Sequence, residues 1–209
     1  MKAMRTALVT VLVATGCTQT APELERSTPE AEGISSAGIE AFLDRLAESG
    51  IEPHSFMLLR HGKVVAEGWW EPYGPQHPHI LFSASKSITS LGVGMAVEEG
   101  RLDLDDRVVS FFPEHVTDSV SPAMRELTVR HLLTMSVGQE EDPAFTAMSG
   151  DESWMKVFMH APPIHEPGSV FLYNNLASFM LSAIVQEATG ERLLAYLQPR
   201  LFEPLGIDS

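Results

Sequence analysis

The chain has 209 residues, of which 44% are hydrophobic and 20% charged, and its formal net charge at pH 7 is -14. This length and apolar content suit one domain with a buried core, or a large piece of one. The acidic balance argues against nucleic acid as a partner and leaves no basic patch for an anionic lipid surface.

The N-terminus is typical of an exported bacterial chain. A basic start precedes an apolar run over residues 7–14, which is too short to span a bilayer. Cys17, the only cysteine, follows small residues at the end of this run, which fits lipid attachment better than a disulfide. We therefore predict a lipoprotein signal peptide over residues 1–16. Ordinary signal-peptidase cleavage stays the alternative, because Ala14 stands where lipoproteins prefer leucine.

Residues 17–29 are polar and proline-rich, which predicts a flexible tether between a membrane and the folded part. The expected location is the bacterial cell envelope, with the chain anchored by a lipid on Cys17. Thr18 is not the aspartate that retains lipoproteins at an inner membrane, which favours the outer membrane where the host has one.

The folded part is expected to begin with a helix over residues 35–49 and a β-hairpin. The hairpin strands cover residues 55–59 and 64–70, and a turn-like Arg-His-Gly-Lys segment joins them. Two strands alone are marginally stable, and an open strand edge invites association. A loop rich in proline and histidine follows over residues 71–80. Its pair His77 and His79 is more typical of a surface loop than of a metal site.

Ser83 and Lys86 form a Ser-x-x-Lys motif at the opening turn of the next predicted helix, which is apolar and ends at Gly100. On a helix these side chains lie one turn apart on the same face and can touch. An amine kept partly unprotonated helps remove the serine proton, and the helix N-terminus helps hold the developing negative charge. Gly92 and Gly94, inside this helix, predict close packing rather than a phosphate loop.

A Ser-x-x-Lys match alone is weak, because a chain of this length yields about one by chance. Ser153 and Lys156 give such a second match, but no long apolar helix or tyrosine motif follows it. The match at Ser83 is followed ninety residues later by Tyr173-Asn174-Asn175. Taken separately, these motifs are better explained as a solvated helix charge and a loop that caps the next helix. Their order and spacing together favour a serine acyl-transfer site.

The remaining elements are mainly helical. Helices are expected within residues 128–135 and 154–159, and a strongly apolar helix over residues 176–188, which Gly190 ends as a C-cap.

The sequence around Ser83, residues 81–90, and the following residues 100–108 closely resemble the serine β-lactamase and penicillin-binding-protein superfamily. The nearest branch is similar to class C β-lactamases and their esterase-like relatives, and the resemblance runs from about Pro29 to the last residue. It implies an α+β fold of the β-lactamase/DD-peptidase-like type, in which an N-terminal hairpin of the antiparallel sheet accompanies a helical domain. Further similar stretches cover residues 127–136, 166–173 and 201–207.

The resemblance also implies the roles of four residues. Ser83 would be the nucleophile, Lys86 its activator, and Tyr173 the general base that accepts the serine proton and returns it to the leaving group. A tyrosine can do this only if nearby positive charge lowers its pKa, which Lys86 could supply. Asn175 would orient Lys86 or bind the substrate amide or ester. The backbone N–H of Ser83 would be one oxyanion donor.

The family's third motif, Lys or His, a small residue and Gly on a C-terminal strand, does not occur in this chain. That strand closes the site and donates the second oxyanion N–H. The resemblance therefore predicts that the domain, residues 30–209, is incomplete at its C-terminus and lacks the C-terminal strands of the sheet. Losing one oxyanion donor costs about a hundred- to thousandfold in rate.

Two classes of function follow. The first is a serine hydrolase that forms an acyl-enzyme on Ser83 with an ester, amide or β-lactam carbonyl. It needs no cofactor or metal, and its partners are that small-molecule substrate and the membrane, with no nucleic acid. The second is a catalytically silent lipoprotein, truncated or split, that retains the binding surface and could pair with a C-terminal complementing fragment.

Overall fold

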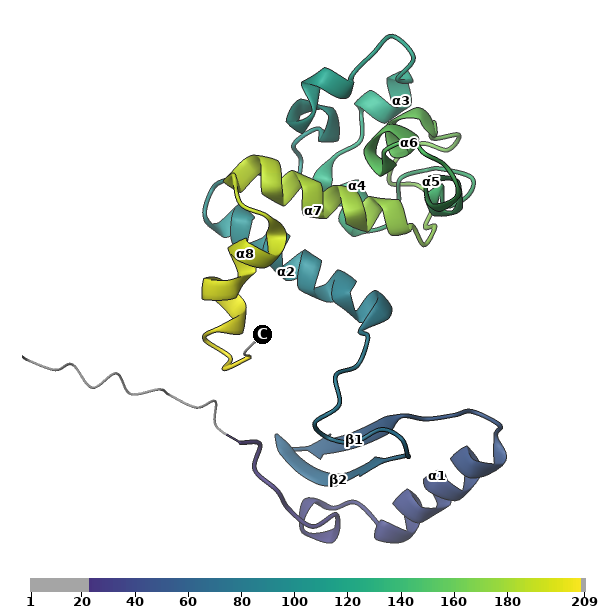
Figure 1. Cartoon of the computed structure of the whole chain (residues 1–209), viewed down its shortest axis with the longest axis vertical. Helices are drawn as coiled ribbons and strands as arrows, with labels where there is room; N and C mark the ends of the chain where they lie inside the picture. Colours follow the sequence, from purple (N-terminus) through teal and green to yellow (C-terminus); the bar gives the residue numbers. More distant parts are fainter. Residues whose placement is uncertain (1–22, 208–209) are drawn as a thin grey trace, which may run out of the picture. The chain divides into compact units, whose positions relative to one another are not determined.

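The computed structural model describes residues 23–207, so the predicted signal peptide and Cys17 lie outside the described residues. The described chain forms two compact units, one of residues 23–76 with 204–207 and one of residues 77–203 (Figure 1). None of the helices within residues 23–207 is both long and apolar enough to cross a membrane.

The first unit contains the predicted helix and hairpin. After a short 3-10 helix η1 (Glu30–Glu32) comes α1 (Ser36–Glu48). Ser35 caps it, because its side chain accepts a hydrogen bond from the Gly38 amide. Strands β1 (Ser55–Arg60) and β2 (Lys63–Trp69) pair antiparallel. Both turn residues have positive φ, 52° at His61 and 78° at Gly62. That turn geometry matches the twist of a tight hairpin.

Residues 25–27 lie against β2, although the sequence assigned them to the flexible tether. The Ser27 amide donates to the Val64 carbonyl (3.0 Å), and the Val64 amide donates to the Glu25 carbonyl (2.8 Å). Arg26 also forms an ion pair with Glu67. A polar composition does not prevent backbone pairing with an open strand edge. The prediction of a tether is therefore wrong for these last residues.

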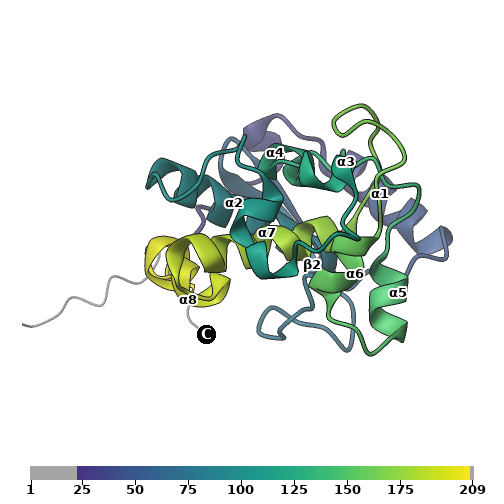
Figure 2. The same ribbon diagram turned by 90° about the horizontal axis from the view of Figure 1, so that it is seen from above.

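The second unit is helical, and its centre is the pair α2 (Ser85–Glu98) and α7 (Asn175–Thr189), which pack side by side (Figures 1 and 2). Gly190 ends α7 with φ of 77°, as predicted. The helices expected within residues 128–135 and 154–159 are also present, whereas α3, α5 and α8 were not predicted. The surrounding elements are η3 (Val108–Phe111), η4 (Pro113–His115), α3 (Pro122–Arg125), α4 (Val129–Leu133), α5 (Ala144–Ser149), α6 (Trp154–His160), α8 (Leu193–Leu197) and η5 (Gln198–Phe202).

The prediction of close packing in α2 is right for one glycine and wrong for the other. A Cβ atom on Gly92 would lie 2.6 Å from Leu193 Cδ1 and 3.5 Å from Leu197 Cδ2, so side chains of α8 pack closely against α2 at this glycine. A Cβ on Gly94 would meet nothing within 4 Å. Gly92 therefore lies where the C-terminal turns pack against the helix that carries Lys86.

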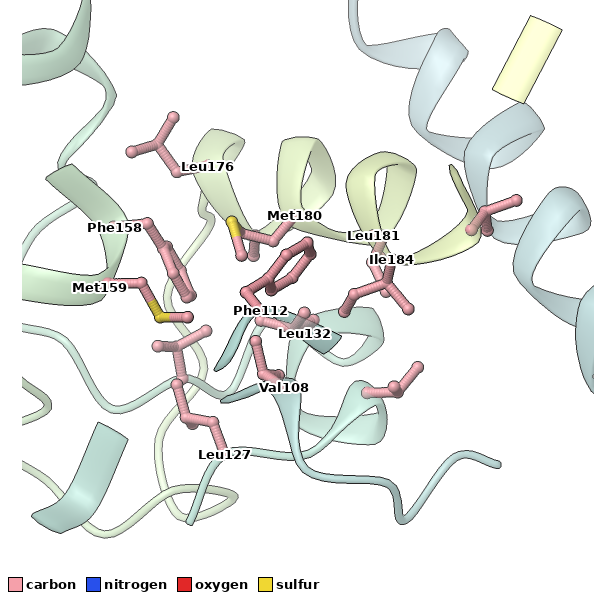
Figure 3. Close-up of a cluster of buried hydrophobic side chains, with 14 of the residues drawn as sticks. Val108, Phe112, Leu127, Leu132, Phe158, Met159, Leu176, Met180, Leu181 and Ile184 are labelled. Atoms are coloured by element: carbon pink, nitrogen blue, oxygen red, sulfur yellow. The ribbon is translucent and has the colours of Figure 1, made fainter. Parts of the chain in front are cut away.

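The core of the helical unit lies between α7 and the elements that surround it (Figure 3). Burial of these apolar side chains holds the helices that carry the site in place. Among the fully buried members are Val108, Phe112, Leu127, Leu132, Phe158, Leu176, Met180 and Ile184.

We predict that Phe158→Ala lowers the free energy of unfolding by about 3–5 kcal/mol, because it removes a ring that is 0% exposed and leaves a cavity. Urea denaturation followed by circular dichroism measures the loss. Phe145→Ala is the matched control, since Phe145 is 81% exposed and its loss should change stability by less than about 0.5 kcal/mol. Equal effects of the two changes would contradict the position of this core.

Candidate active site

Ser83 lies in the 3-10 turn η2 (Phe82–Ala84), directly before α2, so the helix begins two residues later than the serine. Phe82 has φ of 45°, a left-handed conformation that costs a non-glycine residue about 1–3 kcal/mol. Its carbonyl accepts hydrogen bonds from the amide of Ser85 and from the Ser85 hydroxyl (2.6 Å). These bonds hold the strained turn that presents Ser83.

The structure brings together three of the four predicted site residues at the Ser83 hydroxyl. The Tyr173 hydroxyl donates to Ser83 Oγ at 2.6 Å, and Lys86 Nζ donates to the same oxygen at 3.3 Å. Lys86 Nζ also lies 5.2 Å from the centre of the Tyr173 ring. Lys86 is half-buried in this position, so the interpretation of its charge as a solvated helix residue is wrong.

The surroundings of Tyr173 favour its ionised form. The hydrogen bonds with Ser83 and with Lys86, together with the positive charge of Lys86, lower the pKa of the phenol below its ordinary value. The charge of Asp142 opposes this effect weakly. Tyr173 is 43% exposed, so an incoming molecule can reach it.

The backbone N–H of Ser83 donates no hydrogen bond to any of residues 23–207. A free amide in the turn that carries a nucleophile is the kind of donor that can hold an oxyanion. The structure thus leaves this group available for the role that the sequence assigned to it.

Asn175 is held by a residue that the sequence analysis missed. Asp142 Oδ2 accepts hydrogen bonds from the side-chain amide of Asn175 (2.6 Å) and from its backbone amide (3.1 Å). Asp142 Oδ1 accepts from the Ala144 amide (3.1 Å) at the start of α5. An Asp-Pro pair before a helix signals a capping residue. It does not signal a contact with a residue more than thirty positions away.

The residues before and after Tyr173 in the sequence hold it in position through hydrogen bonds. The Leu172 amide donates to the Met135 carbonyl (2.9 Å). Asn174 is fully buried; its Oδ1 accepts from the Ala177 amide (2.8 Å) and its Nδ2 donates to Gln139 Oε1 (2.6 Å). Asn174 is thus the cap of α7, as the plainer interpretation of the motif held. The capping interpretation therefore applies to Asn174, and the catalytic interpretation applies to its neighbour Tyr173.

We predict that Asn174→Ala destabilises the protein by about 2–4 kcal/mol, because it removes a helix cap and leaves the buried Gln139 amide without its partner. Asn174→Ser restores a capping oxygen and should recover about 1 kcal/mol of that loss. Thermal or urea unfolding of the three proteins measures both steps. If Asn174→Ala were as stable as the unchanged protein, this buried bond would not exist in solution.

Two other serines make contacts that resemble parts of a catalytic site. Ser153 caps α6, where its hydroxyl accepts from the Lys156 amide (3.3 Å), while the Lys156 ammonium pairs with Glu152. The second Ser-x-x-Lys match is therefore a helix cap. Ser119 Oγ lies 3.0 Å from His160 Nε2, and His160 Nδ1 lies 2.8 Å from the Lys156 carbonyl. These two serines are controls for any test of Ser83.

Comparison with known proteins covers most of the chain. A family model described as Beta-lactamase matches residues 39–209. The chain is 28% identical to the 6-aminohexanoate-dimer hydrolase of Paenarthrobacter ureafaciens over 74% of this chain and 43% of that protein. It is 27% identical to an esterase of Burkholderia gladioli over 86% of this chain and 53% of that protein.

A solved structure gives the same result for the fold. The octameric penicillin-binding protein homologue from Pyrococcus abyssi aligns with a TM-score of 0.65 and 26% identity, over 83% of this chain and 44% of that one. The chain spans about half the length of the curated relatives it matches. The comparison confirms the α+β fold class predicted from the sequence.

Proposed function

Because the chain belongs to the Beta-lactamase family, we propose that it is a serine hydrolase that acts through an acyl-enzyme on Ser83. The observation that supports this most directly is the pair of contacts at the Ser83 hydroxyl, 2.6 Å to Tyr173 and 3.3 Å to Lys86. A nucleophile within hydrogen-bonding reach of a base, and a cation beside that base, are the parts that such a reaction needs.

The proposed reaction has two halves. In the first, the Tyr173 phenolate takes the proton of Ser83 as Oγ bonds to the substrate carbonyl carbon. The carbonyl π electrons move onto the oxygen, which faces the free Ser83 N–H. The carbonyl then re-forms, the bond to the leaving group breaks, and Tyr173 passes its proton to that group. In the second half, water attacks the acyl carbon and gives a proton to Tyr173, which returns it to Ser83 Oγ as the acid leaves.

The substrate class is an ester, amide or β-lactam. The named relatives include a 6-aminohexanoate-dimer hydrolase and an esterase. One acyl-transfer site serves both bond types, because the same oxyanion and proton transfers occur in each.

The test is a mass measurement on the full chain after treatment with a fluorophosphonate probe, with the adduct located by peptide mapping. We expect one adduct per chain on the peptide that contains Ser83. Ser119→Ala and Ser153→Ala are matched controls and should label as fully as the unchanged protein. An adduct on another serine would refute the proposal, and a folded protein that takes no adduct would favour the catalytically silent alternative.

We also propose that the chain is held in the cell envelope by a lipid on Cys17. The support is the sequence alone: a lone cysteine after small residues at the end of a short apolar run. The mass of the N-terminal peptide from the expressed protein tests it. A diacylglyceryl group on Cys17 that is absent in Cys17→Ser is the expected result, and an unmodified cysteine inside the mature chain would refute it.

A further inference from the structure

Gln139 joins two loops to the start of α7 through buried hydrogen bonds. Its side chain is 4% exposed, and its partner Asn174 is fully buried. Gln139 Nε2 donates to the Ala161 carbonyl (2.7 Å), and Gln139 Oε1 accepts from Asn174 Nδ2 (2.6 Å). Asn174 Oδ1 in turn accepts from the Ala177 amide (2.8 Å). These three bonds form one continuous series from residue 161 to the first turn of α7.

The direction of this series is fixed at both ends. The Ala161 carbonyl can only accept a hydrogen bond, so the NH2 group of Gln139 must face it. The Ala177 amide can only donate, so the carbonyl oxygen of Asn174 must face it. A flip of either side-chain amide would set donor against donor or acceptor against acceptor in a buried place. Both amides are therefore held in a single orientation.

The segment of residues 135–139 holds the residues on both sides of Tyr173. On one side, the Leu172 amide donates to a carbonyl of this segment (2.9 Å). On the other side, Gln139 accepts from Asn174. The first contact joins backbone groups, whereas the second depends on one side chain. Gln139 is thus the point at which a substitution can release one side of Tyr173.

The backbone next to Gln139 is a firm support for this contact. The amides of Ile164 and His165 both donate to the carbonyl of Gly138, at 2.9 and 3.0 Å. A Cβ atom on Gly138 would lie 2.4 Å from the His165 carbonyl oxygen, so the two loops are tightly packed here. The position of Gln139 therefore follows from the packing of the loops around it.

We propose that Gln139 is a positioning residue that acts through Asn174 to hold the Tyr173 hydroxyl at Ser83. This inference rests on the proposed function, because it assigns a support to the base of that reaction. The Tyr173 side chain is 43% exposed, so its own packing encloses it only in part and the held neighbours add to its restraint. A misplacement of about 1 Å at a reacting group can cost about 10²-fold in rate.

Gln139→Met tests the proposal in the full chain, because methionine has a similar length but makes neither hydrogen bond. With a short p-nitrophenyl ester we expect kcat to fall by about ten- to hundredfold and KM to stay within about twofold. Met124→Ala is the control for general damage, since Met124 is a fully buried core residue on α3. Its kcat should stay within about twofold at a temperature where circular dichroism shows both variants to be folded.

A measurement without turnover reports on the surroundings of Tyr173 directly. The chain has three tyrosines, so tyrosine labelled with ¹³C at Cζ gives three signals, and Tyr173→Phe assigns one of them. The contacts with Ser83 and Lys86 lower the pKa of Tyr173, and the charge of Asp142 opposes them weakly. Gln139→Met keeps these charged groups but lets the phenol move away from Ser83 and Lys86. The titration of Tyr173 should therefore shift to higher pH, toward about 10.

Asn174→Ser separates this route from the cap of α7. Serine keeps an oxygen for the Ala177 amide but is too short to reach Gln139. If Gln139 acts through Asn174, then Gln139→Met, Asn174→Ser and the double variant should shift the Tyr173 titration by the same amount. Additive shifts would overturn the route. An unchanged titration in Gln139→Met, or an equal shift in Met124→Ala, would overturn the inference as a whole.

The inference and the proposed function fail in different ways. If the chain hydrolyses no ester and takes no fluorophosphonate adduct, the proposed function fails. The shift of the Tyr173 titration in Gln139→Met would then still establish that Gln139 positions this phenol. If kcat falls in Gln139→Met while the titration stays in place, Gln139 acts on another part of the site and the inference is wrong.

Discussion

Replacing Ser83 by alanine should reduce the hydrolysis of a short p-nitrophenyl ester by roughly 10⁴-fold or more, because removal of the nucleophile from a serine acyl-transfer site costs on this scale. Both Tyr173 and Lys86 contact the Ser83 hydroxyl. Its loss removes the covalent step itself, while the remaining site can still bind the substrate. The expected kinetic pattern is therefore a collapse of kcat with little change in KM.

The controls for this prediction come from the same chain. Ser153→Ala removes a helix cap and Ser119→Ala removes a contact with His160, and both should keep more than about half of the activity. Circular dichroism establishes that each variant is folded. If Ser83→Ala kept substantial activity while Ser119→Ala lost it, the nucleophile would be Ser119, and the assignment of the site would be wrong.

The sequence identifies the reacting residues because they stand in short motifs with fixed geometry. Ser83 and Lys86 must be neighbours on one turn of a helix, and Tyr173 belongs to a motif at the start of another helix. Apolar periodicity predicts where both helices lie in the sequence. Because the two helices pack side by side in the structure, the two motifs come together. The general placement of the site thus follows from local patterns.

Asp142 could not be found in this way, because its contact with Asn175 joins a loop to the first turn of α7. The path of residues 138–143 depends on tertiary packing: the amide of Ile164 donates to the carbonyl of Gly138 (2.9 Å), and a Cβ on Gly138 would lie 2.4 Å from the His165 carbonyl oxygen. No periodic pattern records such constraints. For the same reason the sequence did not predict the short helix α5, which begins just after Asp142.

The pairing of residues 25–27 with β2 shows the same limit. Composition described these residues as polar, and polar composition is typical of a tether. The backbone hydrogen bonds to Val64 do not depend on side-chain polarity, so composition could not reveal them.

The second large effect is expected at Tyr173. Tyr173→Phe keeps the ring but removes the proposed base, and general base catalysis contributes about 10²–10⁴-fold, so kcat should fall by that factor. Tyr73→Phe is the control, since the ring of Tyr73 stacks on His54 in the first unit, and it should leave kcat unchanged. If Tyr173→Phe retained full activity, Lys86 rather than Tyr173 would have to carry the proton.

The pH dependence gives Tyr173 a signature that a structural role would not produce. The base acts as a phenolate, so activity should rise with pH through the pKa of Tyr173, which Ser83 and Lys86 hold below its ordinary value. Lys86→Met removes the positive charge and should move this rise toward about pH 10, whereas Asp142→Asn removes an opposing negative charge and should move it to lower pH. Lys156→Met should leave the profile in place, because Lys156 pairs with Glu152 on α6. Since Lys86 and Asp142 face Tyr173 with opposite charges, shifts of opposite sign would identify Tyr173 as the titrating group, and shifts of the same sign would exclude it.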